Sequence, residues 1–310
     1  MPSTDLQRRP TALRALIGTI LSAMLFGSLP ASSLTNHTPA AGSVYLMGMQ
    51  PLGAQVGEAV ELFARPWVFA LPPGPSSERA YAPLVNYLSR VSGNRIIIEH
   101  PADWLAYQRG MRSGDYDLAF DGAHFASWRI VHSGHEPLVR MSASARFVVV
   151  VSQRERQIAN MPELAGRRLC APPPPDAGTL SLYRQFDNPA RRPLLVPVQK
   201  EDQAYAKMIA GACEAALLPM HLYLRTHRLY ARAVFRTLEM PGDTFTAGPR
   251  LSTEDKAVLT KALLSAEGQA AIRSLYKRAG NTDVFEVAPA SRPDYAGLDA
   301  VLRDVWGFDS

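Results

Sequence analysis

The residues of this chain best suited to hold a small anion follow short apolar runs or precede helices. In the N-terminal half, the expected strand 117–120, apolar from residue 118, leads into a short polar turn made of Asp121, Gly122, Ala123 and His124. Glycine lets a ligand approach the backbone, and histidine can donate a hydrogen bond to an anion. We therefore treat this turn as a candidate ligand site, with a packing or surface role as the alternative for His124.

Two serines stand at the expected start of a helix over residues 78–91. The hydroxyls of Ser76 and Ser77, together with the free N–H groups of a first helical turn, can hold an oxyanion. Serine is also a preferred N-cap, and for a single serine capping is the commoner role. Both roles are compatible only if a ligand replaces part of the cap.

Two further polar residues are candidates by position. Arg146 precedes the apolar run 147–151, where it could neutralise an anion at the boundary between the two halves of the chain. An ordinary solvated arginine is the commoner case. His221 follows an apolar run in the C-terminal half and is expected at the rim of a site.

Two segments about a hundred residues apart share one pattern. Counting from Gly114 and from Gly211, each has Met three residues before, an acid three after and His ten after. Each pattern predicts a helix ended by glycine, then a short apolar strand, then a turn. A buried parallel strand fed by a helix is half of an α/β unit. The echo predicts two similar α/β lobes with a ligand between their strand ends, although chance can supply part of the match.

The remaining patterns define the expected elements and domains. Strands are predicted at 66–71, 96–99 and 147–151, and helices at 78–91, 104–112, 125–131, 179–186, 202–210, 252–264, 267–279 and 295–305. The strand at 147–151 is expected to cross between the lobes. The predicted organisation is lobe 1 over 66–150 with part of the tail at 246–310, and lobe 2 over 151–245.

The N-terminus has the composition of a secretory signal over residues 1–33. Arg8, Arg9 and Arg14 are followed by an apolar run of about 15 residues and then by small residues. That run is shorter than the ~20 residues of a membrane span, which favours a cleaved signal over an anchor. We expect export to the periplasm, and a loosely held lead-in segment over residues 34–65.

Composition and motifs exclude several classes of function. The net charge is +5, of which the three N-terminal arginines less Asp5 contribute +2, leaving a mild and scattered +3. Nucleic-acid binding is therefore not expected. The sequence has no Gly-x-Ser-x-Gly elbow, P-loop or His-Glu-x-x-His motif, and we expect neither an enzyme nor a cofactor or metal.

The chain has two cysteines, Cys170 and Cys213, each beside an expected strand of lobe 2. In an oxidising compartment a disulfide between them is the favoured interpretation. It would close a loop of about forty residues and stabilise the fold by ~3–4 kcal/mol. The alternative is a pair of buried thiols that behave as small apolar side chains.

Four segments, in this order and spacing, resemble periplasmic solute-binding proteins of the phosphate/phosphite/phosphonate uptake type. They are residues 69–88, 113–125, 164–172 and 211–217, and the resemblance extends over about 66–305. It implies a two-lobe α/β fold of the type 2 periplasmic-binding-protein class, with mixed, mostly parallel sheets, flanking helices and a hinge. It also implies a monomer that delivers a small anion to the permease subunits of an ABC transporter. A sensory or accessory module that acts on a partner protein is the alternative.

The resemblance also assigns a ligand role to the start of the helix after Asp176. Family members carry a serine- and threonine-rich turn there, and Gly178 and Thr179 match it, with Asp176 as the expected N-cap. The preceding residues depart from the family, because the four prolines at 172–175 remove four N–H donors. An inward-facing Asp176 would also repel an anion. The resemblance thus predicts the fold more firmly than the ligand.

Overall fold

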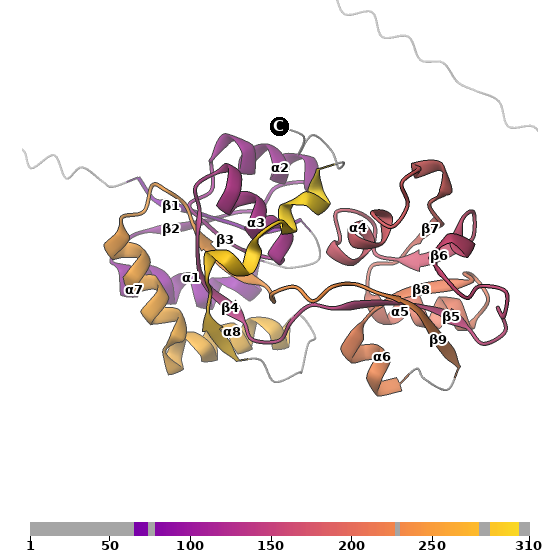
Figure 1. Ribbon diagram of the computed structural model, residues 1–310. Coiled ribbons are helices and arrows are strands. Elements are labelled where there is room, and N and C mark those ends of the chain that lie inside the picture. The colour runs from indigo at the N-terminus through magenta and orange to yellow at the C-terminus, as the bar shows by residue number, and fades with distance from the viewer. Residues whose placement is uncertain (1–64, 74–77, 227–229, 279–285, 304–310) are drawn as a thin grey trace, which may run out of the picture. The chain divides into compact units, whose positions relative to one another are not determined.

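The computed structural model describes residues 65–73, 78–226, 230–278 and 286–303 (Figure 1). Residues 61–310 cluster as one compact unit. The signal-like segment, nearly all of the lead-in segment, and both Ser76 and Ser77 lie outside the described residues. Within the described ranges, no helix is both long enough and apolar enough to cross a bilayer.

In the described part of the chain, the first sheet contains six strands in the order β11-β4-β10-β3-β1-β2. They are β1 (Trp67–Ala70), β2 (Ile96–Glu99), β3 (Leu118–Asp121), β4 (Glu136–Met141), β10 (Thr244–Ala247) and β11 (Val287–Pro289). β1 is parallel to β2 and β3, whereas β10 lies between β3 and β4 and is antiparallel to both. The chain therefore leaves this sheet after β4 and returns in β10.

Helices cover both faces of the first sheet, which explains why β1 is buried along its whole length. On one face, Phe69 and Leu71 pack in a cluster with α1 (Glu78–Ser92), α7 (Thr253–Leu264) and α8 (Ala266–Arg278). On the other face, Val68 and Ala70 pack against α2 (Trp104–Ser113) and α3 (Ala123–His132). This alternation follows from the two-residue period of a strand.

Local sequence signals fix the ends of these helices. The Asp103 side chain accepts a hydrogen bond of 2.8 Å from the N–H of Ala106 and so caps α2. Gly114 ends α2 with a φ of 69°, a left-handed conformation that glycine adopts without strain. Ser252 and Asp255 form a capping box at the start of α7.

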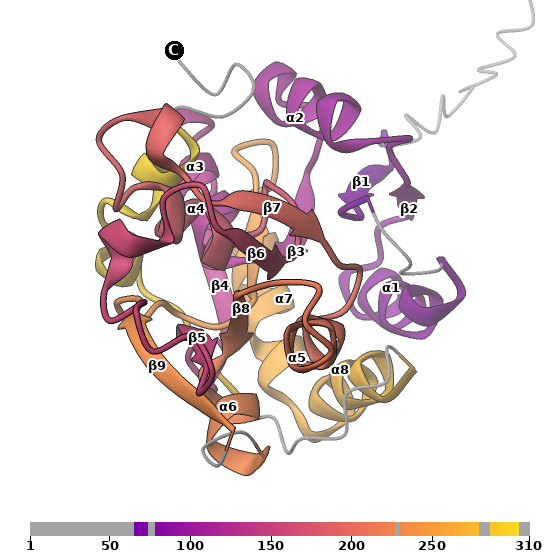
Figure 2. The same ribbon diagram turned by 90° about the vertical axis from the view of Figure 1, so that its right-hand side faces the viewer.

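Among the described residues, the second sheet has five strands in the order β7-β6-β8-β5-β9. They are β5 (Phe147–Ser152), β6 (Arg168–Ala171), β7 (Leu194–Pro197), β8 (Ala215–Pro219) and β9 (Ala231–Arg236). α5 (Glu201–Ile209) and α6 (Met220–Thr226) contribute to the core on one face (Figure 2). The short helices α4 (Ala177–Tyr183) and η1 (Met161–Leu164) contribute to the core on the other.

Two elements differ from the sequence-based expectation. β5 pairs with β8 and β9 and lies wholly in the second sheet, so the change of sheet comes between Met141 and Phe147 rather than near residue 150. A run of buried valines looks the same in either sheet, and the sequence could not assign it. The helix predicted at 295–305 is replaced by two 3₁₀ turns, η3 (Arg292–Tyr295) and η4 (Leu298–Leu302). They are separated at Gly297, which has a φ of 75°.

The internal echo corresponds to equivalent places in the two sheets. β3 lies between parallel β1 and antiparallel β10, and β8 lies between parallel β6 and antiparallel β5. The echoed acids also act alike. Asp117 Oδ2 accepts from the N–H of Val68 in β1, and Glu214 Oε2 accepts from the N–H of Arg168 in β6, both at 2.8 Å. Each acid thereby ties its strand to the neighbouring parallel strand.

The expected disulfide is present. Cys170 in β6 and Cys213, just before β8, are bonded, with 5.7 Å between their Cα atoms. Both cysteines are buried in the cluster that β5, β8 and α5 share. The bond cross-links two neighbouring parallel strands, as the sequence predicted.

Candidate functional site

A cleft of about 1220 Å³ is lined by residues of both lobes. Lobe 1, built on the first sheet, contributes the β1–α1 turn, the start of α2 and the junction between β3 and α3. Lobe 2, built on the second sheet, contributes the β6–α4 turn and the residues before α5. The two connections between the sheets also line the cleft, through Ala145, Phe147, Met240 and Pro241. The cleft therefore lies where a hinge motion would open or close it.

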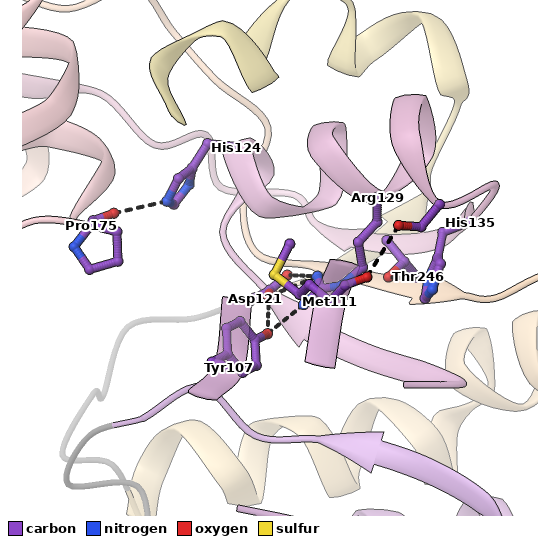
Figure 3. Close-up of polar contacts among 9 residues, drawn as sticks. Tyr107, Met111, Asp121, His124, Arg129, His135, Pro175 and Thr246 are labelled. Carbon is purple, nitrogen blue, oxygen red and sulfur yellow. Dashed lines mark hydrogen bonds and ion pairs between the residues drawn. The ribbon is translucent and has the colours of Figure 1, made fainter. Parts of the chain in front are cut away.

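Asp121 ends β3 at the cleft, and its charge is balanced from within the protein (Figure 3). Arg129 Nη1 lies 2.8 Å from both of its carboxylate oxygens, and the Tyr107 hydroxyl donates to Oδ2. All three side chains are buried. Burial raises the pKa of Asp121, and the Arg129 guanidinium opposes that rise. The ion pair fixes the β3–α3 junction and removes the negative charge that would otherwise face a bound anion.

His124, the second residue of α3, joins the two lobes. Its Nε2 lies 3.0 Å from the carbonyl oxygen of Pro175, so this nitrogen carries the proton and donates (Figure 3). Burial lowers the pKa of His124 to about 4, so the ring is neutral at neutral pH. Its buried Nδ1 has no hydrogen-bond partner within the described residues. Because the ring is neutral and its N–H is used by Pro175, the free Nδ1 is an acceptor, so His124 brings neither a positive charge nor a free side-chain donor to the cleft.

Gly122 and Ala123 complete the junction. Gly122 is the N-cap of α3, and a Cβ at this position would lie 2.9 Å from His124 Cε1. Glycine therefore leaves room for the histidine ring to fold over the turn. The N–H groups of Ala123 and His124 have no acceptor in the part of the chain that the structure describes. N–H groups in the first turn of a helix are suited to hold an anion.

The lobe 2 candidates lie behind the wall of the cleft. The Thr179 N–H donates to Asp176 Oδ1 at 2.8 Å, and its hydroxyl donates to the carbonyl of Pro172 at 2.7 Å. A Cβ on Gly178 would lie 2.7 Å from the Phe147 ring. Neither Gly178 nor Thr179 is among the lining residues, whereas Asp176 is. Burial raises the pKa of Asp176 to about 6. The N–H groups of Thr179 and Gly178 stabilise the carboxylate and only partly offset this rise.

Arg146 and His221 also lie away from the cleft lining. Arg146 is exposed, and its Nη2 pairs with Glu239 Oε2 at 2.8 Å. His221 occupies the second position of α6, equivalent to His124 in α3, but it is exposed. Of the predicted ligand residues that the structure describes, it brings together Asp121, Gly122, Ala123 and His124.

Several lining residues were not found from the sequence. The cations are Arg79 and Lys200, and the rings include Trp104 and Tyr276. The Tyr276 hydroxyl donates to Asp243 Oδ2 at 2.7 Å, and desolvation raises the pKa of that carboxyl. These residues come from helices and from the returning chain, so a search for polar residues after strands does not reach them. No group of three or more potential metal ligands occurs in the described ranges.

Comparison with known families decides what kind of protein carries this cleft. The profile of the family described as "ABC transporter, phosphonate, periplasmic substrate-binding protein" matches residues 70–295. The chain belongs to this family. Its members are substrate-binding proteins rather than enzymes, and they work with the other components of ABC transporters.

Solved structures with low sequence identity to this chain share its two-lobe fold. PhnD1 from Prochlorococcus marinus, in complex with methylphosphonate, is 14% identical with a TM-score of 0.56, covering 77% of this chain and 97% of that one. A Xanthomonas citri protein bound to ATP is 16% identical with a TM-score of 0.60, covering 76% and 96%. Among curated proteins, none matches this chain.

Proposed function

We propose that this protein is an extracytoplasmic solute-binding protein that captures a small phosphonate- or phosphate-like anion between its lobes and delivers it to an ABC permease. The observation that carries the proposal is the cleft lined by both lobes, in a chain of the phosphonate-binding family. Ligands of open α/β sheets bind beyond the carboxyl ends of the parallel strands, and β3 ends at Asp121 in this cleft.

The binding step follows from the groups at the β3–α3 junction. The N–H groups of Ala123 and His124 hold the anion, and Asp121 does not repel it because Arg129 balances its charge. Arg79 and Lys200 add positive charge. Ser76 and Ser77, which directly precede α1 in the sequence, remain proposed ligand residues.

Closure of the lobes then excludes water from the ligand. The hydrogen bond from His124 to Pro175 links the two sides, and the two connections between the sheets act as the hinge. Hinge closure of this kind gives a permease a distinct, ligand-loaded surface to recognise. The signal-like residues 1–33 and the disulfide support a location outside the cytoplasm.

A thermal-shift screen of the mature chain tests the proposal. The probes are phosphate, phosphite, methylphosphonate, phenylphosphonate and sulfate, because a ligand that binds only the native state raises the Tm with concentration. We expect a saturable rise with a phosphorus oxyanion, weakened by His124→Ala and retained by His221→Ala. His221→Ala is the matched control, since His221 is exposed at the equivalent place in lobe 2. No shift with any of these anions would contradict the proposal.

A further inference from the structure

The proline-rich β6–α4 turn of the lobe 2 wall offers few groups that could hold an anion, whereas Gln199 and Lys200 line the cleft farther along, before α5. Pro172, Pro173 and Pro175 line the cleft and have no N–H groups. The N–H of Asp176 donates to the carbonyl of Pro173 at 3.2 Å, and that of Thr179 donates to Asp176 Oδ1. These two N–H donors are thus used by acceptors of the same segment.

A carboxylate of the chain itself occupies the start of α4. The Asp176 side chain is the N-cap of α4 and accepts a hydrogen bond from the N–H of Thr179 in the first helical turn. Among the described residues no cation forms an ion pair with Asp176. An anionic group resting on this wall would meet a like charge, which is unfavourable.

Apart from its charged residues, His124 and Gln199, the rest of the cleft lining is largely apolar. Phe147 and Ala177 lie beside the prolines, and Trp104 and Tyr276 contribute rings that are only partly buried. Trp104 is held by stacking on Phe125, with ring centres 5.5 Å apart and an interplanar angle of 11°. Such rigid rings bury apolar ligand surface with little loss of side-chain entropy.

The size of the cleft also favours a ligand larger than phosphate. Its volume of about 1220 Å³ exceeds the ~300–1,000 Å³ of pockets that enclose drug-sized ligands. The cleft therefore has room for a ligand larger than phosphate or methylphosphonate, and the lobe closure proposed above would reduce that room.

Building on the proposed function, we infer that the ligand is an amphiphilic oxyanion, a phosphonate with a bulky apolar or aromatic substituent. The head group lies at the α3 amides of lobe 1, and the substituent lies against the proline wall of lobe 2 and the ring of Trp104. Asp176 is the specificity-determining residue, because its carboxylate disfavours a second anionic or strongly hydrated group on that wall.

Titration calorimetry with a graded series tests the inference. The probes are phosphate and the methyl-, butyl-, phenyl- and 2-aminoethyl-phosphonates, at fixed pH and salt. Affinity should rise roughly fourfold for each methylene that becomes buried, and phenylphosphonate should bind at least about tenfold more tightly than methylphosphonate. Trp104→Ala should remove most of that gain, so that the ratio of the phenylphosphonate to the methylphosphonate affinity falls toward one. Leu105→Ala is the matched control, since Leu105 is exposed and outside the lining.

A second pair of variants tests the role of Asp176. Asn caps a helix as well as Asp does, so Asp176→Asn removes the charge while keeping the cap. Phosphate should gain roughly fivefold in affinity, and the preference for phenylphosphonate over phosphate should narrow. Asp187→Asn makes the same charge change at an exposed site of lobe 2 outside the lining and should alter neither value.

Each contrary outcome has a distinct meaning. If phosphate or methylphosphonate binds as tightly as phenylphosphonate, the inference is wrong and the proposed function stands. Tighter binding of the 2-aminoethyl than of the butyl compound would also overturn it, because the carboxylates of the cleft would then be selecting an ammonium group. If none of the series binds, the proposed function itself fails.

Discussion

The Nε2–H of His124 donates to the carbonyl oxygen of Pro175 over 3.0 Å, linking the start of α3 in lobe 1 to the β6–α4 turn of lobe 2. The ring is buried, stacks near Phe125 and is neutral at neutral pH. A neutral donor can bridge the lobes without the desolvation cost of a charge. This contact therefore couples the proposed anion site at the start of α3 to the interface between the lobes.

Acid should weaken this form of the protein through His124. Its pKa is lowered from 6.5 to about 4 here, so the stability it contributes is complete above about pH 6.5 and is lost as pH falls toward 4. The loss at pH 4 is on the order of 3 kcal/mol. Chemical denaturation across pH 4 to 7 measures it, with His124→Gln expected to flatten the dependence.

Two other groups with shifted pKa values also change the stability between pH 4 and 7, so the experiment needs a control. His135 also has a lowered pKa, about 3, and adds to the acid loss. Asp176 has a raised pKa, about 6, so it stabilises the fold as pH falls through 6 and opposes the histidines. The difference between wild type and His124→Gln isolates His124. If His221→Gln flattened the curve equally, the assignment to His124 would be wrong.

Breaking the buried ion pair below the cleft should be costly. Arg129→Met leaves the Asp121 carboxylate buried without its cation, and we expect a loss of about 3–5 kcal/mol in the free energy of unfolding. Adding Asp121→Asn should restore part of it. Urea denaturation measures both. The exposed pair Arg90–Glu267 is the matched control, and Arg90→Ala should cost less than ~1 kcal/mol.

Gly122→Ala should affect binding more than folding. The backbone of Gly122 has a φ of −61°, which any residue adopts, but the new Cβ would lie 2.9 Å from His124 Cε1. The ring must move away from Pro175, and we expect about a tenfold loss of phosphonate affinity with a small change in Tm. Gly166→Ala is the converse control, because its φ of 70° predicts a loss of roughly 1 kcal/mol in stability and normal binding.

The disulfide should stabilise lobe 2 without taking part in binding. Cys170 and Cys213 are separated by 43 residues, for which the loop-entropy estimate is about 4 kcal/mol. The variant with both cysteines changed to alanine should unfold at lower denaturant concentration and still bind phosphonate. A reductant should lower the stability of the wild type only. An equal effect of reductant on the variant would argue against the disulfide as the cause.

The sequence predicted the parts of the fold whose signals are local. The glycine stops at Gly114 and Gly211 and the apolar runs of β3 and β8 all depend on neighbouring residues. β5 was assigned to the wrong side of the crossover because strand pairing is a long-range property that a valine run does not encode.

The site was only partly predictable for the same reason. The turn at Asp121–His124 follows directly from its strand, and the structure places it in the cleft. Thr179 matches a family position, but Asp176 and Pro172 take its polar groups, which only the folded turn reveals. Trp104 and Asp243 reach the cleft from distant elements, and no spacing in the sequence relates them to Asp121.

The most direct test of the central claim is the distance between the lobes with and without ligand. Spin labels at Leu105→Cys in α2 and Leu194→Cys in β7, both exposed positions, report it by pulsed electron paramagnetic resonance. We expect saturating phenylphosphonate to replace a broad distribution with a single shorter distance. An unchanged distribution, under conditions where calorimetry shows that the labelled protein binds phenylphosphonate, would contradict capture of the ligand between the two lobes.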